Sequence, residues 1–197
     1  MLMTVERLKL ANLTRHHLLQ LQEQFAGKDA EVEISVPSES NTSSSPGEMN
    51  EDKFWESMEL LDWTKAGNDD AVIEPVVQFL SKLPESAILT FYDLLSEKLY
   101  LLDSREFAVH SSEEGNGISS DLFLYARCCV VANGRRFYEN VLKNPASFPK
   151  DIFFEAILKI PERAWFRKTG KSLEYSPKYI YETGFNPSGW GADTITL

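Results

Sequence analysis

One stretch of this sequence limits the possible folds more than any other, and it lies between residues 122 and 134. Its only charged residue is Arg127, and at about 100° per residue its apolar side chains fall on more than one side of a helix. A helix that is apolar on several sides is normally surrounded by other helices. We therefore predict a mainly α-helical fold around a central helix over residues 119–142, with Gly134 as the point where that helix bends or splits.

Two amphipathic segments before this stretch are expected to pack against it. The first helix is predicted to begin at Asn50, a good N-cap that is followed by two acidic residues, and to end at Gly67. Asp69 or Asp70 is expected to cap the second helix. Pro75 is tolerated there if it lies in the opening turn.

Three further segments complete the predicted domain. Pro84 opens a third helix that reaches Leu102, because proline is well suited to the start of a helix. A later helix is expected between the prolines that bracket its apolar residues, which are Ile152, Phe153, Ile157 and Leu158. Beyond Gly170 the chain reads as aromatic coil interrupted by proline.

The N-terminal part of the chain differs in character from the rest. Its apolar spacing predicts a helix over residues 4–25, and the alternation over residues 31–36 predicts a short edge strand or extended arm. Residues 37–47 contain no apolar side chain and are predicted to form a flexible linker. A chain of 197 residues is short for two cores. The predicted parts are therefore an N-terminal helix and arm (1–36), a disordered linker (37–49), one helical domain (50–169) and an aromatic tail packed on that domain (170–197).

The charge of the chain is unevenly distributed along the sequence. The formal net charge of −10 divides into −3 over residues 1–49, −10 over residues 50–120 and +3 over residues 121–197. The acidic middle segment would repel nucleic acid and anionic lipid and would attract a basic protein. The alternative interpretation is a solvated surface that keeps the protein soluble.

Several features indicate a cytosolic protein. No run of residues is long and apolar enough to span a membrane, and the N-terminus has no secretion signal. The two cysteines, Cys128 and Cys129, are neighbours and are expected to be reduced core thiols. Three histidines, with no Walker loop, dinucleotide fingerprint, zinc-protease helix or nucleophile elbow, lead us to predict no cofactor, metal or catalytic residue.

The residues around the predicted central helix resemble the sequence pattern of a known family. It is carried by matching residues at Ser119, Asp121, Phe123, Arg127, Gly134 and Arg135. Phe54-Trp55 and Asn144-Pro145 extend the likeness, which covers roughly residues 50–160. The sequence resembles the bacterial family catalogued as domain of unknown function 4240. The resemblance implies a helical fold and a bacterial origin, and it implies no reaction.

The resemblance marks four residues as candidates for binding a ligand or partner: Asp121, Arg127, Arg135 and Trp55. Six residues along a helix leave Asp121 and Arg127 about 120° apart, so each would have to pair with another element. Asp121 is expected to stabilise the first helical turn, and Arg127 to form a buried, hydrogen-bonded ion pair with an acidic residue from 51–106. The alternative is that the two serve a catalytic or ligand-binding site.

Three functions from different classes follow. The first, which we favour, is a non-enzymatic acidic module that binds a basic protein, in the manner of bacterial inhibitor or immunity proteins. The second is an enzyme or small-ligand binder that uses Asp121, Arg127 and Arg135. The third is nucleic-acid binding through the C-terminal stretch, where basic residues alternate with aromatic ones such as Trp165 and Tyr175. A purely structural role is a further alternative.

Overall fold

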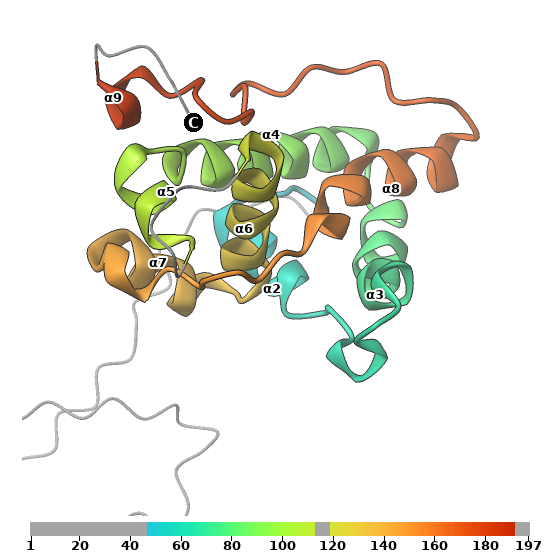
Figure 1. The fold of residues 1–197 in the computed structure, drawn as a ribbon. Coiled ribbons are helices and arrows are strands. Elements are labelled where there is room, and N and C mark those ends of the chain that lie inside the picture. The colour runs from blue at the N-terminus through green and yellow to red at the C-terminus, as the bar shows by residue number, and fades with distance from the viewer. Residues whose placement is uncertain (1–46, 113–118, 192–197) are drawn as a thin grey trace, which may run out of the picture. The chain divides into compact units, whose positions relative to one another are not determined.

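The computed structural model describes residues 47–112 and 119–191, and these residues form helices and the loops between them (Figure 1). The α-helices are α2 (Glu51–Met58), α3 (Asp69–Ser81), α4 (Glu85–Leu101), α5 (Arg105–His110), α6 (Ser120–Ala132), α7 (Arg135–Lys143), α8 (Ile160–Thr169) and the single turn α9 (Pro187–Trp190). The 3₁₀ turns are η2 (Trp63–Lys65), η3 (Pro145–Ser147) and η4 (Glu155–Lys159). No strand occurs within the described ranges, and the predicted mainly α-helical fold is confirmed.

Several predictions concern parts of the chain outside the described residues. The helix over residues 4–25, the arm over residues 31–36 and most of the linker fall there, as does the end of the tail after residue 191. Met49, the last residue of the predicted linker, is described and is buried against the domain.

Helix α6 lies at the centre of the domain, as its sequence predicts. Nine of its 13 residues are buried. Figure 1 shows α6 crossing α4, and it also packs against α7 and η4. A single helix was predicted over residues 119–142, but the structure has two, α6 and α7. The helix is interrupted because Gly134 adopts a φ of +83° that a helix interior does not allow. Of the two outcomes expected at Gly134, the split is therefore confirmed.

Helix α2 begins as predicted and ends earlier than predicted. The Asn50 side chain accepts a hydrogen bond from the Lys53 backbone amide, which confirms the N-cap. The helix stops at Met58 and does not reach Gly67, so this boundary was wrong. Asp62 explains the difference, because its side chain accepts from the backbone N–H of Thr64 and caps the new turn η2.

Helix α3 also departs from the prediction in two details. Its N-cap is Asn68, which accepts from the Ala71 amide, while the predicted caps Asp69 and Asp70 occupy the first turn. Pro75 lies in the second turn of the helix, beyond the opening turn that was expected. The missing N–H of Pro75 costs one helical hydrogen bond. The apolar face that α3 buries from Val72 to Leu80 offsets this loss.

The helix predicted around Ile152, Phe153, Ile157 and Leu158 is wrong. Asp151 adopts a φ of +53° and breaks any helix there, so Ile152 and Phe153 lie in an irregular segment. Helical structure starts only at Glu155, as η4, and continues as α8. Pro161 does not bound a helix but lies in the first turn of α8, where its fixed φ is favourable.

The C-terminal segment after α8 packs along α4. Gly170 ends α8 with a φ of +71°, and the chain then runs past α4 to α9, as Figure 1 shows. Tyrosine rings hold this segment: Tyr181 lies 6.4 Å from Tyr92, and Tyr179 lies 5.2 Å from Tyr100, between ring centroids. Helix α5, which the sequence analysis did not predict, contacts α9.

Candidate functional site

Arg127 is fully buried at the middle of α6, with 0% of its surface exposed. One terminal nitrogen, Nη1, donates to the backbone carbonyl of Leu99 at 2.9 Å, and Nη2 donates to the Thr183 hydroxyl at 2.9 Å. The guanidinium also lies 4.9 Å from the centre of the Phe123 ring. Its Nε has no hydrogen-bond partner among the described residues. Two of the five N–H groups of Arg127 thus donate to groups inside the domain.

Asp103 is the acidic partner of Arg127. Its Oδ1 lies 3.9 Å from Nη1, and both side chains are 0% exposed. Burial lowers the pKa of the Arg127 guanidinium, and the Asp103 carboxylate opposes that shift. This pair confirms the expected buried ion pair between the central helix and an acidic residue of 51–106, whereas the expected direct hydrogen bond is replaced by those to Leu99 and Thr183.

Asp103 also binds the tail. Its two carboxylate oxygens accept from the backbone amides of Gly184 and Asn186 at 2.9–3.0 Å, and Oδ1 accepts from Trp190 Nε1 at 2.8 Å. The Thr183 hydroxyl, which accepts from Arg127, donates in turn to the carbonyl of Ser120. Arg127 and Asp103 therefore join α6, the end of α4 and the tail, and we call this group the Arg127–Asp103 node. Sequence analysis did not single out Asp103. Its position directly after the apolar face of α4 was the available signal that this carboxylate is buried.

Asp121 and Arg135 lie at opposite ends of α6. Asp121 is exposed in the first turn of α6, where the helix dipole favours its charge. Arg135 opens α7 and donates to Asp52 at 2.6 Å and to Glu139 at 3.0 Å. These hydrogen bonds, led by that to Asp52, raise the pKa of Arg135. A helix of 13 residues is about 20 Å long. Asp121, Arg127 and Arg135 are thus not gathered in one cleft.

Trp55 belongs to the core. Only 4% of its surface is exposed, and its ring packs against Phe54 and Tyr138 at centroid distances of 5.0 and 5.1 Å. Its Nε1 donates to Glu51 at 3.4 Å. Trp55 and Arg135 both contact the first turn of α2, through Glu51 and Asp52 respectively.

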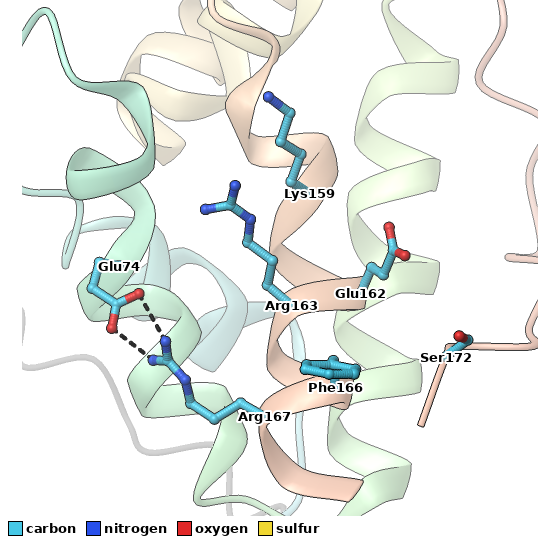
Figure 2. Close-up of a pocket in the computed structure, with 7 residues that line it drawn as sticks. All are labelled: Glu74, Lys159, Glu162, Arg163, Phe166, Arg167 and Ser172. Carbon is cyan, nitrogen blue, oxygen red and sulfur yellow. Dashed lines mark hydrogen bonds and ion pairs between the residues drawn. The ribbon is translucent and has the colours of Figure 1, made fainter. Parts of the chain in front are cut away.

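A polar cleft of about 660 Å³ lies against α8 (Figure 2). Figure 2 shows Arg163 and Arg167 reaching from α8 toward α3. Arg167 binds both carboxylate oxygens of Glu74 at 2.7 and 3.0 Å, and Arg163 binds Asp70 at 2.7 Å. These arginines lower the pKa of each carboxyl group. The cleft holds paired charges that link two helices, and its only neutral polar lining residue is Ser172.

The basic and aromatic residues of the C-terminal stretch are largely engaged inside the domain. Asp93 of α4 accepts from the Tyr175 hydroxyl at 3.0 Å and from the Lys178 amide at 3.0 Å. The Lys178 ammonium lies 3.7 Å from the same carboxylate. Tyr175, Tyr179 and Tyr181 all pack on tyrosines of α4. Few of these groups are left free to stack on bases.

The stretch from the last turn of α2 to the first turn of α3 carries the opposite charge, and most of its charged side chains are exposed to solvent. We define the acidic connection as residues 56–70, whose carboxylates belong to Glu56, Glu59, Asp62, Asp69 and Asp70 and whose only basic residue is Lys65. Glu56, Glu59 and Asp69 are exposed, and none of them forms an ion pair with a described residue. Trp63, which lies among them, is 46% exposed. The capping pattern of Asp62 and Thr64 was the available sequence signal that a turn presents Trp63 here.

The two cysteines lie inside the domain. Cys128 is 0% exposed and Cys129 is 6% exposed, and burial raises the pKa of both thiols. Within residues 47–112 and 119–191, no three His, Cys, Asp or Glu side chains gather closely enough to hold a metal ion.

Native protein is therefore expected to resist alkylation at both thiols, because a buried thiol reaches neither the reagent nor the reactive thiolate state. Iodoacetamide at neutral pH should leave the mass of the native chain unchanged, whereas both cysteines should react in concentrated urea. Mass spectrometry distinguishes the two states. Rapid modification of Cys129 in the native protein would contradict the central position of α6.

The described residues thus define an all-α domain with the buried Arg127–Asp103 node and the exposed carboxylates of the acidic connection. The family model described as "Protein of unknown function (DUF4240)" matches residues 49–167, which is more than half of the chain, and the chain belongs to that family. The resemblance found in the sequence is thereby confirmed. No curated protein and no solved structure matches the chain. Among the helices of the described residues, none has both the length and the apolarity needed to cross a membrane.

Proposed function

We propose that this chain is a non-enzymatic protein-interaction module that binds a basic protein partner. One observation carries the proposal: the acidic connection is exposed, with Glu56, Glu59 and Asp69 free of ion pairs to described residues. Exposed charges of one sign steer an oppositely charged partner into contact and raise the rate of association.

The pairing of charges elsewhere supports this proposal. Ion pairs engage five basic residues of the C-terminal part, namely Arg127, Arg135, Arg163, Arg167 and Lys178. Each has an acidic partner in residues 50–120. Ion pairs within the domain therefore largely neutralise the +3 charge of the C-terminal part. Most carboxylates of the acidic connection form no ion pair with a described residue, and they can attract an outside partner.

The two alternatives receive less support from the geometry. A ligand site formed by Asp121, Arg127 and Arg135 would need residues that extend from the first turn of α6 to the first turn of α7, one of them with no exposed surface. Nucleic-acid binding would need basic and aromatic groups that already contact α3 and α4. Both alternatives would require the tail or α8 to leave its place.

The proposal is tested by neutralising two carboxylates of the acidic connection. Protein captured from the native host at low salt would be identified, purified and measured by stopped-flow association with wild type and with Glu56→Gln/Glu59→Gln. We expect a basic partner whose association rate falls about two- to tenfold in the variant and falls further as salt increases.

A matched control removes the same net charge elsewhere. Glu85 and Glu106 are exposed acidic residues in the first turns of α4 and α5, outside the acidic connection. Glu85→Gln/Glu106→Gln should leave the association rate close to that of wild type. Equal effects of the two double variants would mean that net charge alone matters. A partner that binds independently of salt and of both variants would overturn the proposal.

A further inference from the structure

Exposed apolar residues lie within the acidic connection and in the segment that packs against it. The Trp63 ring packs against Phe154, with 5.0 Å between ring centroids and 51° between ring planes. Phe154 is nearly buried, whereas Trp63 is 46% exposed, and Ile152 and Phe153, which directly precede Phe154, are 54% and 39% exposed. We call Trp63, Ile152 and Phe153 the Trp63 surface. An exposed aromatic ring packed against a segment that carries two further exposed apolar residues is a feature typical of binding sites.

The backbone holds the Trp63 surface in place on both sides. The Asp62 amide donates to the carbonyl of Val72 at 3.0 Å, which ties η2 to α3. The Phe154 amide donates to the carbonyl of Tyr125 at 3.1 Å, and the Asp151 amide donates to that of Ser111 at 3.0 Å. Because these bonds anchor both segments to the domain, binding would require little ordering of the backbone.

Charge identifies the kind of partner that fits. Glu56, Glu59 and Asp69 lie within seven residues of Trp63 in the sequence, and Lys65 is the only basic residue of that connection. A second copy of the chain would bring a like-charged connection and a net charge of −10 to the interface, which opposes self-association. A basic segment would meet complementary charge.

We infer that the Trp63 surface is the docking site for a basic protein segment that inserts an apolar side chain beside Trp63. This inference rests on the proposed function and deepens it, because it adds an apolar anchor to the acidic recognition. Tryptophan is enriched among the residues that contribute most to binding, and such residues are commonly surrounded by polar groups. Trp63 contributes the anchor, and the carboxylates of the acidic connection select basic partners.

Two synthetic helical peptides of equal length and equal lysine content test the inference. One carries leucine along a single face, and the other carries serine at the same positions. Titration calorimetry should give about tenfold or tighter affinity for the leucine peptide, since burying one leucine corresponds to at least that factor. Trp63→Ser should remove most of the preference.

Phe185→Ser is the matched control, because Phe185 is an exposed aromatic residue (53%) in the tail, outside the Trp63 surface. It should leave the preference for the leucine peptide unchanged. Ile152→Ser removes an exposed side chain without touching the contact between Trp63 and Phe154, so it tests the inference even if Trp63→Ser does not fold.

Each outcome separates this inference from the proposed function. If both peptides bind alike and Glu56→Gln/Glu59→Gln weakens both, the inference is overturned while the proposed function stands. A preference that survives Trp63→Ser and Ile152→Ser also overturns it. A wild-type dimer that Trp63→Ser dissociates, seen by sedimentation, would assign the surface to a second copy and overturn the inference. Failure of both peptides to bind at low salt would contradict the proposed function as well.

Discussion

Replacing Arg127 with methionine should lower the free energy of unfolding by about 3–5 kcal/mol, because it leaves a buried carboxylate without its counter-charge. Asp103 is 0% exposed, and Arg127 supplies the nearest positive charge, at 3.9 Å. The variant also leaves the carbonyl of Leu99 and the hydroxyl of Thr183 without the hydrogen bonds that Arg127 donates. Denaturant unfolding monitored by circular dichroism measures the loss, with the slope of the transition checked for change.

Two further variants separate the charge effect from lost packing. Arg127→Met/Asp103→Asn removes the uncompensated charge and should recover part of the stability. Recovery is incomplete because an amide oxygen replaces two carboxylate oxygens that accept from Gly184, Asn186 and Trp190.

Arg135→Met provides the surface control. Arg135 forms two ion pairs but is 46% exposed, so its loss should cost about 1 kcal/mol or less. If Arg127→Met is as stable as wild type, the structural interpretation of the Arg127–Asp103 node is wrong. Arg127 would then become the first residue to test for ligand binding.

Substituting Gly189 with alanine should destabilise the domain by about 1–3 kcal/mol through overpacking. A Cβ at this position would collide with the carbonyl oxygen of Asp103 and would lie 2.7 and 2.9 Å from Cβ and Cα of Ser104. Because these atoms belong mostly to the backbone, α9 must move away. That movement would draw Trp190 from Asp103, which accepts its Nε1–H.

The movement of α9 can be measured separately from the loss of stability. Trp190 is only 8% exposed in the structure, so quenching of tryptophan fluorescence by acrylamide should increase in Gly189→Ala. Ser188→Ala, at an exposed position of the same turn, is the control and should behave as wild type. Unchanged stability and quenching in Gly189→Ala would show that the tail does not depend on this close approach.

Arg127→Met and Gly189→Ala both act on one arrangement, in which the buried Asp103 carboxylate holds the tail. The tail is attached to α4 by hydrogen bonds and ring contacts, and Asp103 is the acceptor for three of its N–H groups. A tail secured in this way contacts Ser120, Phe123 and Arg127 of α6. The acidic connection lies on other elements, namely α2, η2 and α3.

Local features of the sequence determined the start of the helices and the identity of the central one. Asn50 caps α2, and Pro84 precedes α4, because capping and proline geometry depend on only a few neighbouring residues. The nearly uncharged stretch around Arg127 identified α6, since a helix that is apolar on several sides can be stable only when surrounded. The family also followed from residues of this stretch.

Tertiary structure alone decided which groups meet across the chain. Arg127 and Asp103 are 24 positions apart, and Asp103 meets Trp190 from a segment that has no periodic pattern. The position of Trp63 was also decided by tertiary structure. The predicted longer α2 would have placed Trp63 on that helix, whereas in the structure Trp63 lies in η2 and packs against Phe154. Helical periodicity specifies which face of a helix is buried, whereas the partner of a buried charge or exposed ring depends on how distant elements pack.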